Sequence, residues 1–258
     1  MYETILFEEV NGVVRIVMNR PDKFNAFTEV MNREITDAFK KANSSSNIRS
    51  IVLTGAGKAF NAGQDLGDVQ GNQVNFGGFL RMRYNPMIQQ IQQTEKPVIA
   101  AVNGVAAGAG MSMALACDIR LASEKASFAN VFVNIGLVPD SGGCYFLPRI
   151  VGIGKALELA MTGEKISAEE AFRIGLVNRV YSADQFESEV MAFAEKLAKL
   201  PTKGIGLIKR TMYKGLHMGL GETLEYEAYA QEIAGHTQDH AEGVRAFFEK
   251  RPPVFKGW

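Results

Sequence analysis

The alternation of apolar and polar residues near the start of the chain predicts a β-hairpin. Two apolar runs, Tyr2–Val10 and Val13–Met18, flank Asn11-Gly12, the dipeptide most typical of a two-residue hairpin turn. Short apolar runs farther along the chain predict buried strands. These runs are Ser50–Thr54, Val98–Val102, Asp118–Ala122 and Leu176–Val180.

Apolar residues at helical spacing predict helices between these strands. Thr28 can cap a first helix that extends to about Ala42, and a second helix spans about Phe79–Gln93. Between them, the polar residues 43–47 predict a loop. The glycine-rich residues 67–78 predict a loop that is mobile.

The last part of the chain has a helical pattern throughout. Ser167 and Glu170 have the spacing of a helix capping box. Four helical segments follow: Asp184–Leu200, Gly206–Leu216, Glu222–Ala234 and His240–Lys250. Strands that alternate with helices predict an α/β fold with a mostly parallel sheet. We therefore predict an α/β core over residues 1–195 and a helical appendage over residues 196–258, whose apolar faces would pack on a neighbouring subunit.

Composition narrows the possible classes of protein. The 258 residues are 47% hydrophobic and 22% charged, with 28 basic and 28 acidic residues. A normal apolar content with zero net charge excludes a disordered chain and argues against a general nucleic-acid scaffold, which usually carries a basic excess. Two cysteines cannot make a disulfide framework and are compatible with a reducing compartment. The N-terminus lacks the pattern of a targeting segment, so we expect a cytoplasmic protein.

One uncharged stretch, Val98–Cys117, has about the length that spans a bilayer. Asn103-Gly104 inside it predicts a turn that divides it into a short strand and a short helix. We therefore expect no membrane span.

Several familiar motifs are incomplete, which argues against the functions that they signal. Gly55-Ala56-Gly57-Lys58 lacks the rest of a phosphate-binding loop, and neither Gly108-x-Gly110 nor Gly152-x-Gly154 has the third glycine of a dinucleotide site. His236 and His240 have metal-ligand spacing but lack the adjacent glutamate of the hydrolytic zinc motif. No metal or redox cofactor is expected. A Ser-His-Asp hydrolase is disfavoured, because no Gly-x-Ser-x-Gly elbow occurs.

Two glycine-rich turns are better candidates for a functional site. The first is Ala59–Leu66, and the second is Val102–Gly110, which continues into a helix. Small residues let a ligand approach the backbone, and free N–H groups at a helix start attract negative oxygen. Two such turns side by side could supply two N–H donors to one oxyanion. Tight packing of strand on helix explains the same small residues equally well.

A third segment, Gly136–Gly143, contains a Pro-Asp-x-Gly-Gly turn. Its carboxylate, Asp140, could serve in acid–base chemistry. It could equally be the N-cap of a following helix.

Together these three segments resemble the crotonase superfamily, the enoyl-CoA hydratase/isomerase family. The resemblance rests on Phe60–Gln64, the Asn103–Gly110 run, Cys117-Asp118-Ile119 and Gly136–Gly143, in that order, and it extends over essentially the whole chain. It implies a spiral of ββα units with C-terminal helices that serve in trimerisation, the trimers often pairing into hexamers. It also implies an acyl-CoA thioester as substrate, with CoA part of that substrate and no separate cofactor.

The resemblance further implies an oxyanion hole made by the backbone N–H groups of Gln64 and Ala109. The side chains at these positions would matter little. The two catalytic glutamates of the hydratases would stand at Ser112 and Phe132, so both hydratase acids are missing here. Asp140 stands where the family's isomerases carry an acid, including those that act on the ring epoxide of phenylacetyl-CoA. A single carboxylate suffices to move a proton between two carbons, whereas adding water requires both a base and an acid.

The resemblance also assigns residues that bind the substrate. Those expected to contact CoA are Lys23, Phe24, Ala26, Ala62, Asp65 and Leu66, together with Phe247 and Lys250, one helical turn apart, from a neighbouring subunit. Those expected to line the acyl pocket are Ser112, Phe132, Val138 and Pro139.

Three alternatives remain open at this point. The chain could be a hydratase in spite of the missing acids. It could be a dehalogenase or thioesterase that uses Asp140 as a nucleophile. It could also be a non-catalytic RNA-binding member of the same fold, with Lys203–Lys214 as the nearest candidate for a basic stripe.

Overall fold

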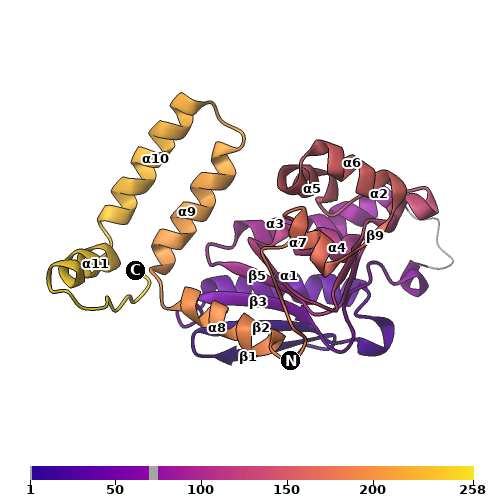
Figure 1. The fold of residues 1–258 in the computed structure, drawn as a ribbon, viewed down its shortest axis with the longest axis horizontal. Coiled ribbons are helices and arrows are strands. Elements are labelled where there is room, and N and C mark those ends of the chain that lie inside the picture. The colour runs from indigo at the N-terminus through magenta and orange to yellow at the C-terminus, as the bar shows by residue number, and fades with distance from the viewer. Residues whose placement is uncertain (1, 70–74) are drawn as a thin grey trace.

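The structure is a computed structural model that describes residues 2–69 and 75–258. The described residues form a six-stranded and a four-stranded sheet (Figure 1). The larger sheet has the order β1 (Ile5–Val10), β2 (Val13–Met18), β3 (Ser50–Gly55), β5 (Val98–Val102), β7 (Ile119–Ser123), β10 (Arg179–Tyr181). The smaller sheet has the order β4 (Ala59–Asn61), β6 (Val105–Ala107), β8 (Ser127–Ala129), β9 (Lys165–Ser167).

The chain alternates between the two sheets. β3, β5 and β7 pair in parallel in the larger sheet, and each is followed at once by a short strand of the smaller sheet, β4, β6 and β8. Those three short strands also pair in parallel. Antiparallel pairing joins β1 to β2 and β8 to β9. The result is a spiral of ββα units, as the family resemblance implies.

Helices cover the sheets and fill the space between them. In the core they are α1 (Glu29–Ser44), α2 (Phe76–Phe79), α3 (Asn85–Gln93), α4 (Ala109–Ala116), α5 (Gly143–Val151), α6 (Ile153–Thr162), α7 (Ala168–Arg173) and α8 (Phe186–Ala198). Short 3₁₀ helices lie at η1 (Pro21–Lys23), η2 (Leu66–Val69) and η4 (Val131–Ile135), and a π-helix, η3 (Leu80–Tyr84), precedes α3.

The central strands are buried on both faces, which explains their continuous apolar sequence. On one face of β3, Ile51 and Leu53 pack in the main core with α1, α3 and α4. On the other face, Val52 packs against α8 through Val190 and Ala194. Alternate residues of a strand point to opposite faces, so each side of the sheet acquires its own apolar layer.

The C-terminal helices form an arm beside this core. α9 (Thr202–Gly215) and α10 (Leu220–Gly235) run side by side, and α11 (Gln238–Phe248) follows at the lower end of α10 (Figure 1). Just after α9, the His217 ring contacts Tyr145 of α5. Arg49 ties the base of the arm to the core, because its guanidinium donates to Thr202 Oγ1 at 2.9 Å and to the Phe255 carbonyl at 2.8 Å. The division into core and appendage at residues 195 and 196 stays a prediction. The last helix on the sheet ends at Ala198, and α9 begins at Thr202.

Most local predictions agree with the structure, with shifts at the ends of elements. Asn11 has φ +51° and Gly12 φ +77° in the hairpin turn, as predicted. Thr28 caps α1 by accepting the Met31 N–H, although the helix extends to Ser44 and takes in part of the predicted polar loop.

Other predictions were wrong in part. The strand predicted at Leu176–Val180 is observed as β10 at Arg179–Tyr181. Leu176 is buried, as its apolar side chain suggested, but it does not belong to a strand. Of the predicted loop 67–78, the structure shows η2 and α2 at its two ends, and residues 70–74 lie outside the described part. His236 ends α10 and Thr237 caps α11, so His236 and His240 do not share one helix.

The run Val98–Cys117 divides at Asn103-Gly104, as predicted, into β5, β6 and α4. Over the described ranges, no helix combines the length and the apolar character needed to cross a membrane.

Candidate active site

The first glycine-rich turn is held in place by a buried asparagine. Asn61 ends β4 and is fully buried. Its Nδ2 donates to the Asn25 carbonyl at 2.6 Å, and its Oδ1 accepts the Gly63 N–H at 2.8 Å. A buried amide that satisfies backbone groups in this way fixes the path of the chain around it.

Beyond Asn61, the turn pairs with the loop that precedes α1. The Phe27 N–H donates to the Gly63 carbonyl at 2.8 Å, and the Asp65 N–H donates to the Phe27 carbonyl at 3.0 Å. These two bonds make a parallel bridge between Phe27 and Gln64. In such a bridge the N–H of the middle residue points away from its partner. The Gln64 N–H therefore points to the opposite side, and it donates to no group among the described residues.

The second glycine-rich turn lies directly against the first. A Cβ built on Gly110 would lie 2.3 Å from the Asn61 carbonyl oxygen, and one on Gly63 would lie 3.7 Å from the Ala109 nitrogen. Ala109 is the first residue of α4, so its N–H has no acceptor within the helix. Among the described residues it donates to no other group either. The structure thus brings the backbone N–H groups of Gln64 and Ala109 to adjoining turns, and their joint role as an oxyanion hole stays a prediction.

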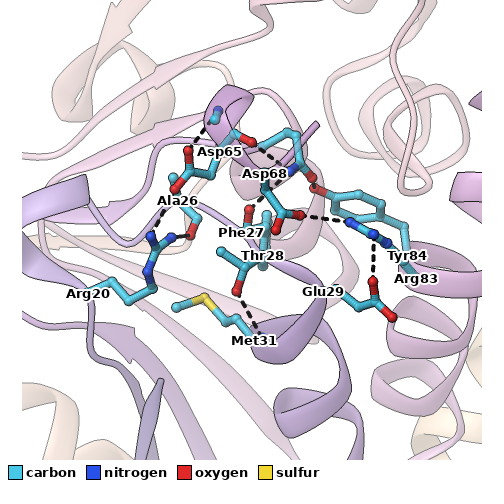
Figure 2. A network of polar contacts seen from close by, with 12 residues as sticks. Arg20, Ala26, Phe27, Thr28, Glu29, Met31, Asp65, Asp68, Arg83 and Tyr84 are labelled. Atoms are coloured by element: carbon cyan, nitrogen blue, oxygen red, sulfur yellow. Dashed lines mark hydrogen bonds and ion pairs between the residues drawn. The ribbon is translucent and has the colours of Figure 1, made fainter. Parts of the chain in front are cut away.

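The side chain of Gln64 makes its own contacts, and the expectation that it matters little for the oxyanion role stays a prediction. Its Nε2 donates to the Asp65 carbonyl at 2.9 Å and to the Phe27 carbonyl at 3.2 Å, and its Oε1 accepts the Tyr84 hydroxyl at 2.7 Å. Figure 2 shows this network, in which Tyr84 points toward Phe27 and the segment that holds Asp65. Sequence reasoning missed Tyr84, because nothing in its immediate sequence marks a contact with a residue 20 positions away.

The third segment lies against the start of the same helix. A Cβ on Gly143 would lie 2.8 Å from Ser112 Oγ in α4 and 3.2 Å from Pro139. The interpretation of Asp140 as a helix N-cap is wrong, because α5 begins at Gly143 with Gly142 in the cap position. Asp140 instead accepts the Ser141 hydroxyl at 2.9 Å.

Asp140 is close enough to Tyr84 for its charge to raise the pKa of that phenol, an effect second to the burial of the tyrosine. Burial raises the pKa of the Asp140 carboxyl above its ordinary value, and the hydrogen bond from Ser141 opposes this rise only in part. A carboxylate with a raised pKa is a stronger base than an exposed aspartate.

The other residues expected in the acyl pocket divide into two groups. Ser112 and Phe132 are buried, and the Phe132 ring would lie 3.8 Å from a Cβ on Gly108. Pro139 is half-buried beside Gly143. Val138 differs, because 77% of its side chain is exposed in the single chain. Val138 is therefore apolar but is not buried by the fold of this chain.

Most residues expected to contact CoA come together in one place. Ala62 donates its N–H to the Phe24 carbonyl at 3.1 Å, so the loop with Lys23, Phe24 and Ala26 lies beside the segment with Ala62, Asp65 and Leu66. Arg20 joins the two through Asp65 at 2.9 Å and the Ala26 carbonyl at 2.7 Å (Figure 2). The bond from Arg20 holds the pKa of Asp65 below its ordinary value. Lys23 and Phe24 remain exposed.

Phe247 and Lys250 are not part of this group. Phe247 is 78% exposed on α11, which lies well apart from α4 in Figure 1. The expectation that the pair is one helical turn apart was wrong, because α11 ends at Phe248 and Lys250 has φ +53° beyond it. The expectation that the pair contacts CoA from a neighbouring subunit stays a prediction.

The fold and the paired turns define the class of the protein. Residues 8–258 match the sequence model of the family described as Enoyl-CoA hydratase/isomerase, and the chain belongs to this family and has its crotonase fold.

Among individual proteins, the chain is 43% identical over 256 residues to a probable enoyl-CoA hydratase of Rhodobacter capsulatus, with 99% of each chain covered. It is 39% identical over 261 residues to the 1,2-epoxyphenylacetyl-CoA isomerase of Escherichia coli, with 100% of each covered. The crystal structure of an enoyl-CoA hydratase from Bacillus anthracis is 36% identical with a TM-score of 0.95, covering 99% of this chain and 100% of the other.

The contact between the two turns can be tested with Gly110→Ala. The new Cβ would meet the Asn61 backbone at 2.3 Å, and backbone cannot yield as a flexible side chain can. We expect a loss of about 2 kcal/mol or more in the free energy of unfolding by urea, together with loss of activity as α4 moves away from Asn61. Gly221→Ala is the matched control, since within the described part of the chain no atom lies within 4 Å of its Cβ position. Equal stability of the two variants would contradict the contact.

Proposed function

We propose that the protein is an acyl-CoA isomerase that shifts a proton, and with it a double bond, on an enoyl-CoA or a ring-epoxide phenylacetyl-CoA thioester. The observation that carries this proposal is Asp140, a carboxyl group whose pKa is raised by burial and whose segment packs against the helix that begins with Ala109. A base of this kind, beside two free N–H donors, supports proton abstraction next to a thioester carbonyl.

The N–H groups of Gln64 and Ala109 would polarise the thioester carbonyl. When a proton leaves the carbon next to that carbonyl, negative charge moves onto the carbonyl oxygen and an enolate forms. One such donor contributes about 3 kcal/mol to the stability of the transition state. Because the donors belong to backbone fixed by Asn61 and α4, they need no rearrangement as the charge develops.

Asp140 would take the proton from one carbon and return it to another. The carboxylate accepts the proton as the enolate forms, and the resulting carboxylic acid donates it at the new position, so the enzyme ends in its starting state. Buried Ser112 and Phe132 occupy the positions at which the family resemblance puts the two acids of a hydratase. Neither side chain can activate water or protonate carbon well.

A hydratase is the second candidate function. It is favoured by the relative from Rhodobacter capsulatus, described as a probable enoyl-CoA hydratase and 43% identical, against 39% for the isomerase from Escherichia coli. Both activities use the same enolate and the same N–H donors. In a hydratase, water adds to the double bond, whereas in an isomerase only a proton moves. The side chains that face the acyl chain decide between these two reactions.

We further propose that the chain assembles as a trimer or a pair of trimers, with CoA bound between subunits. Two unlike apolar surfaces support this. The arm surface consists of Leu220, Leu224, Val244, Phe247 and Phe248, and the core surface consists of Ile135, Val138, Ile153, Leu157 and Met161, all exposed. The arm surface belongs to α10 and α11, and the core surface belongs to η4, α6 and the segment between η4 and α5. Two unlike surfaces favour head-to-tail association, which gives a closed ring when the rotation allows it.

Asp140→Asn tests the proposed base. We expect acyl-CoA binding to persist and kcat to fall by at least about 100-fold, the usual size of an acid–base contribution, measured with 3-enoyl-CoA. In the parent enzyme, activity should fall with decreasing pH as the carboxylate becomes protonated. Because burial raises the pKa of Asp140, this fall should begin above the pH range of an ordinary aspartate.

The matched control is Asp184→Asn, an exposed aspartate outside the site, which should keep parental kcat. Isomerase activity of Asp140→Asn within a few-fold of the parent would exclude Asp140 as the base. A covalent acyl- or aryl-enzyme mass adduct on Asp140 would instead indicate a nucleophile.

The rate of crotonyl-CoA hydration distinguishes an isomerase from a hydratase. We expect the parent to hydrate crotonyl-CoA slowly, and Ser112→Glu with Phe132→Glu to raise that rate by roughly 10-fold, since added acid–base groups contribute on this scale. The gain should remain modest, because the two carboxylates would raise each other's pKa. The assay is loss of the conjugated thioester absorbance, with 3-hydroxyacyl-CoA confirmed as product. Rapid hydration by the parent would establish the hydratase.

The oligomeric state can be read by light scattering. We expect a particle of three or six chains of 28.2 kDa, and we expect Phe248→Asp on the arm surface to lower that mass, because a charge buried in an apolar interface is costly. A monomeric parent at micromolar concentration would refute the trimer.

A further inference from the structure

Tyr84, at the end of η3, contacts the first glycine-rich turn through Gln64. It is almost fully buried, at 1% exposure, and it packs edge-on against Phe27 with 5.4 Å between ring centroids and at a tilt against Phe79 at 5.9 Å. Its hydroxyl donates to Gln64 Oε1 at 2.7 Å. A tyrosine anchored on two rings, with its one polar atom aimed at an amide, can hold that amide in a single orientation.

The Gln64 amide passes this constraint to the backbone. Its Nε2 donates to the Phe27 and Asp65 carbonyls, while the Asp65 N–H donates to the same Phe27 carbonyl. The side chain therefore links the Asp65 carbonyl to the Phe27 carbonyl on the neighbouring loop, beside the backbone bridge that sets the direction of the Gln64 N–H. Because the amide oxygen Oε1 accepts the Tyr84 hydroxyl, the amide cannot rotate by half a turn without losing this hydrogen bond.

The π-helix explains how Tyr84 reaches this position. η3 ends at Tyr84, and Arg83 just before it pairs with Asp68 at 2.8 Å and with Glu29 at 2.6 Å. Two adjacent residues thus contact the segment from Gln64 to Asp68 (Figure 2). A π-turn is a rare departure from the α-helix that frequently marks a functional site.

We propose that Tyr84 is a positioning residue for the oxyanion hole: through the Gln64 side chain, its hydroxyl sets the direction of the Gln64 N–H. This inference rests on the proposed function, in which that N–H receives the thioester oxygen. Burial and the nearby Asp140 charge keep the pKa of Tyr84 above its ordinary value, so the hydroxyl remains a donor throughout the working pH range.

Tyr84→Phe is the central test, because it removes the hydroxyl and keeps the ring that packs on Phe27 and Phe79. We expect kcat to fall by about 10-fold with KM within about 2-fold, less than the roughly 100-fold loss on removal of a whole donor. The direct readout is the infrared carbonyl band of bound phenylacetyl-CoA labelled with ¹³C at the thioester carbon. The parent should shift this band to lower frequency, and Tyr84→Phe should shift it less.

Tyr2→Phe is the matched control, since Tyr2 also donates its hydroxyl to a side chain, Asp37 at 2.8 Å, and makes no hydrogen bond to Gln64. It should leave both the kinetics and the carbonyl band unchanged. Gln64→Leu should reproduce the effect of Tyr84→Phe. The double variant should lose no more than the worse single variant, because both changes remove one interaction.

The outcomes separate this inference from the proposed function. A parental carbonyl shift in Tyr84→Phe, or additive losses in the double variant, would overturn the positioning role and leave the isomerase proposal intact. Conversely, a reduced shift in Tyr84→Phe together with full activity of Asp140→Asn would support the positioning role and refute the proposed base. Absence of any shift in the parent would refute the oxyanion hole, and with it this inference.

Discussion

The direct contact between the Asn61 backbone and the start of α4 is the constraint on which the rest of the site depends. At Gly110 a side chain would occupy the space of the Asn61 carbonyl, and at Gly63 it would crowd the Ala107 carbonyl oxygen at 3.1 Å. Glycine at these two positions lets main chain touch main chain. The donors of Gln64 and Ala109 are therefore placed by the sheets and α4. Asp140, the proposed base, belongs to a separate segment that begins beyond η4, so its position does not depend on the contact between the two turns.

Much of the fold could be predicted because its signals are local. The hairpin at Asn11-Gly12, the cap at Thr28 and the turn at Asn103-Gly104 each depend on a few neighbouring residues. The smaller sheet could not be predicted, since strands as short as β4 and β6 acquire their identity from partners far along the chain. Leu176 shows the related limit: an apolar residue signals burial, and burial does not require a strand.

The site shows the same division. The two glycine-rich turns and Asp140 carry enough pattern to be recognised, and the start of α5 at Gly143 decides against Asp140 as a helix cap. The link from Tyr84 to Gln64 carries no pattern. It depends on a π-turn and on the register between a helix and a loop, and neither follows from hydrophobic periodicity. The exposed side chain of Val138 is a further case, because an apolar residue type does not by itself say whether the fold of the chain buries it.

The hydrogen bonds around Asp140 bear on its strength as a base. A carboxylate that accepts several hydrogen bonds has a low pKa and holds protons weakly. The Asp140 carboxylate accepts the Ser141 hydroxyl and, among the described residues, no other donor, whereas the Asp140 carbonyl accepts the Gly143 N–H at 2.8 Å. Tyr84 is close, yet its hydroxyl is committed to Gln64. The Tyr84 hydroxyl thus contributes no hydrogen bond to the carboxylate. Burial then raises the pKa of Asp140, which brings the carboxyl nearer to the condition in which one group can both take and return a proton.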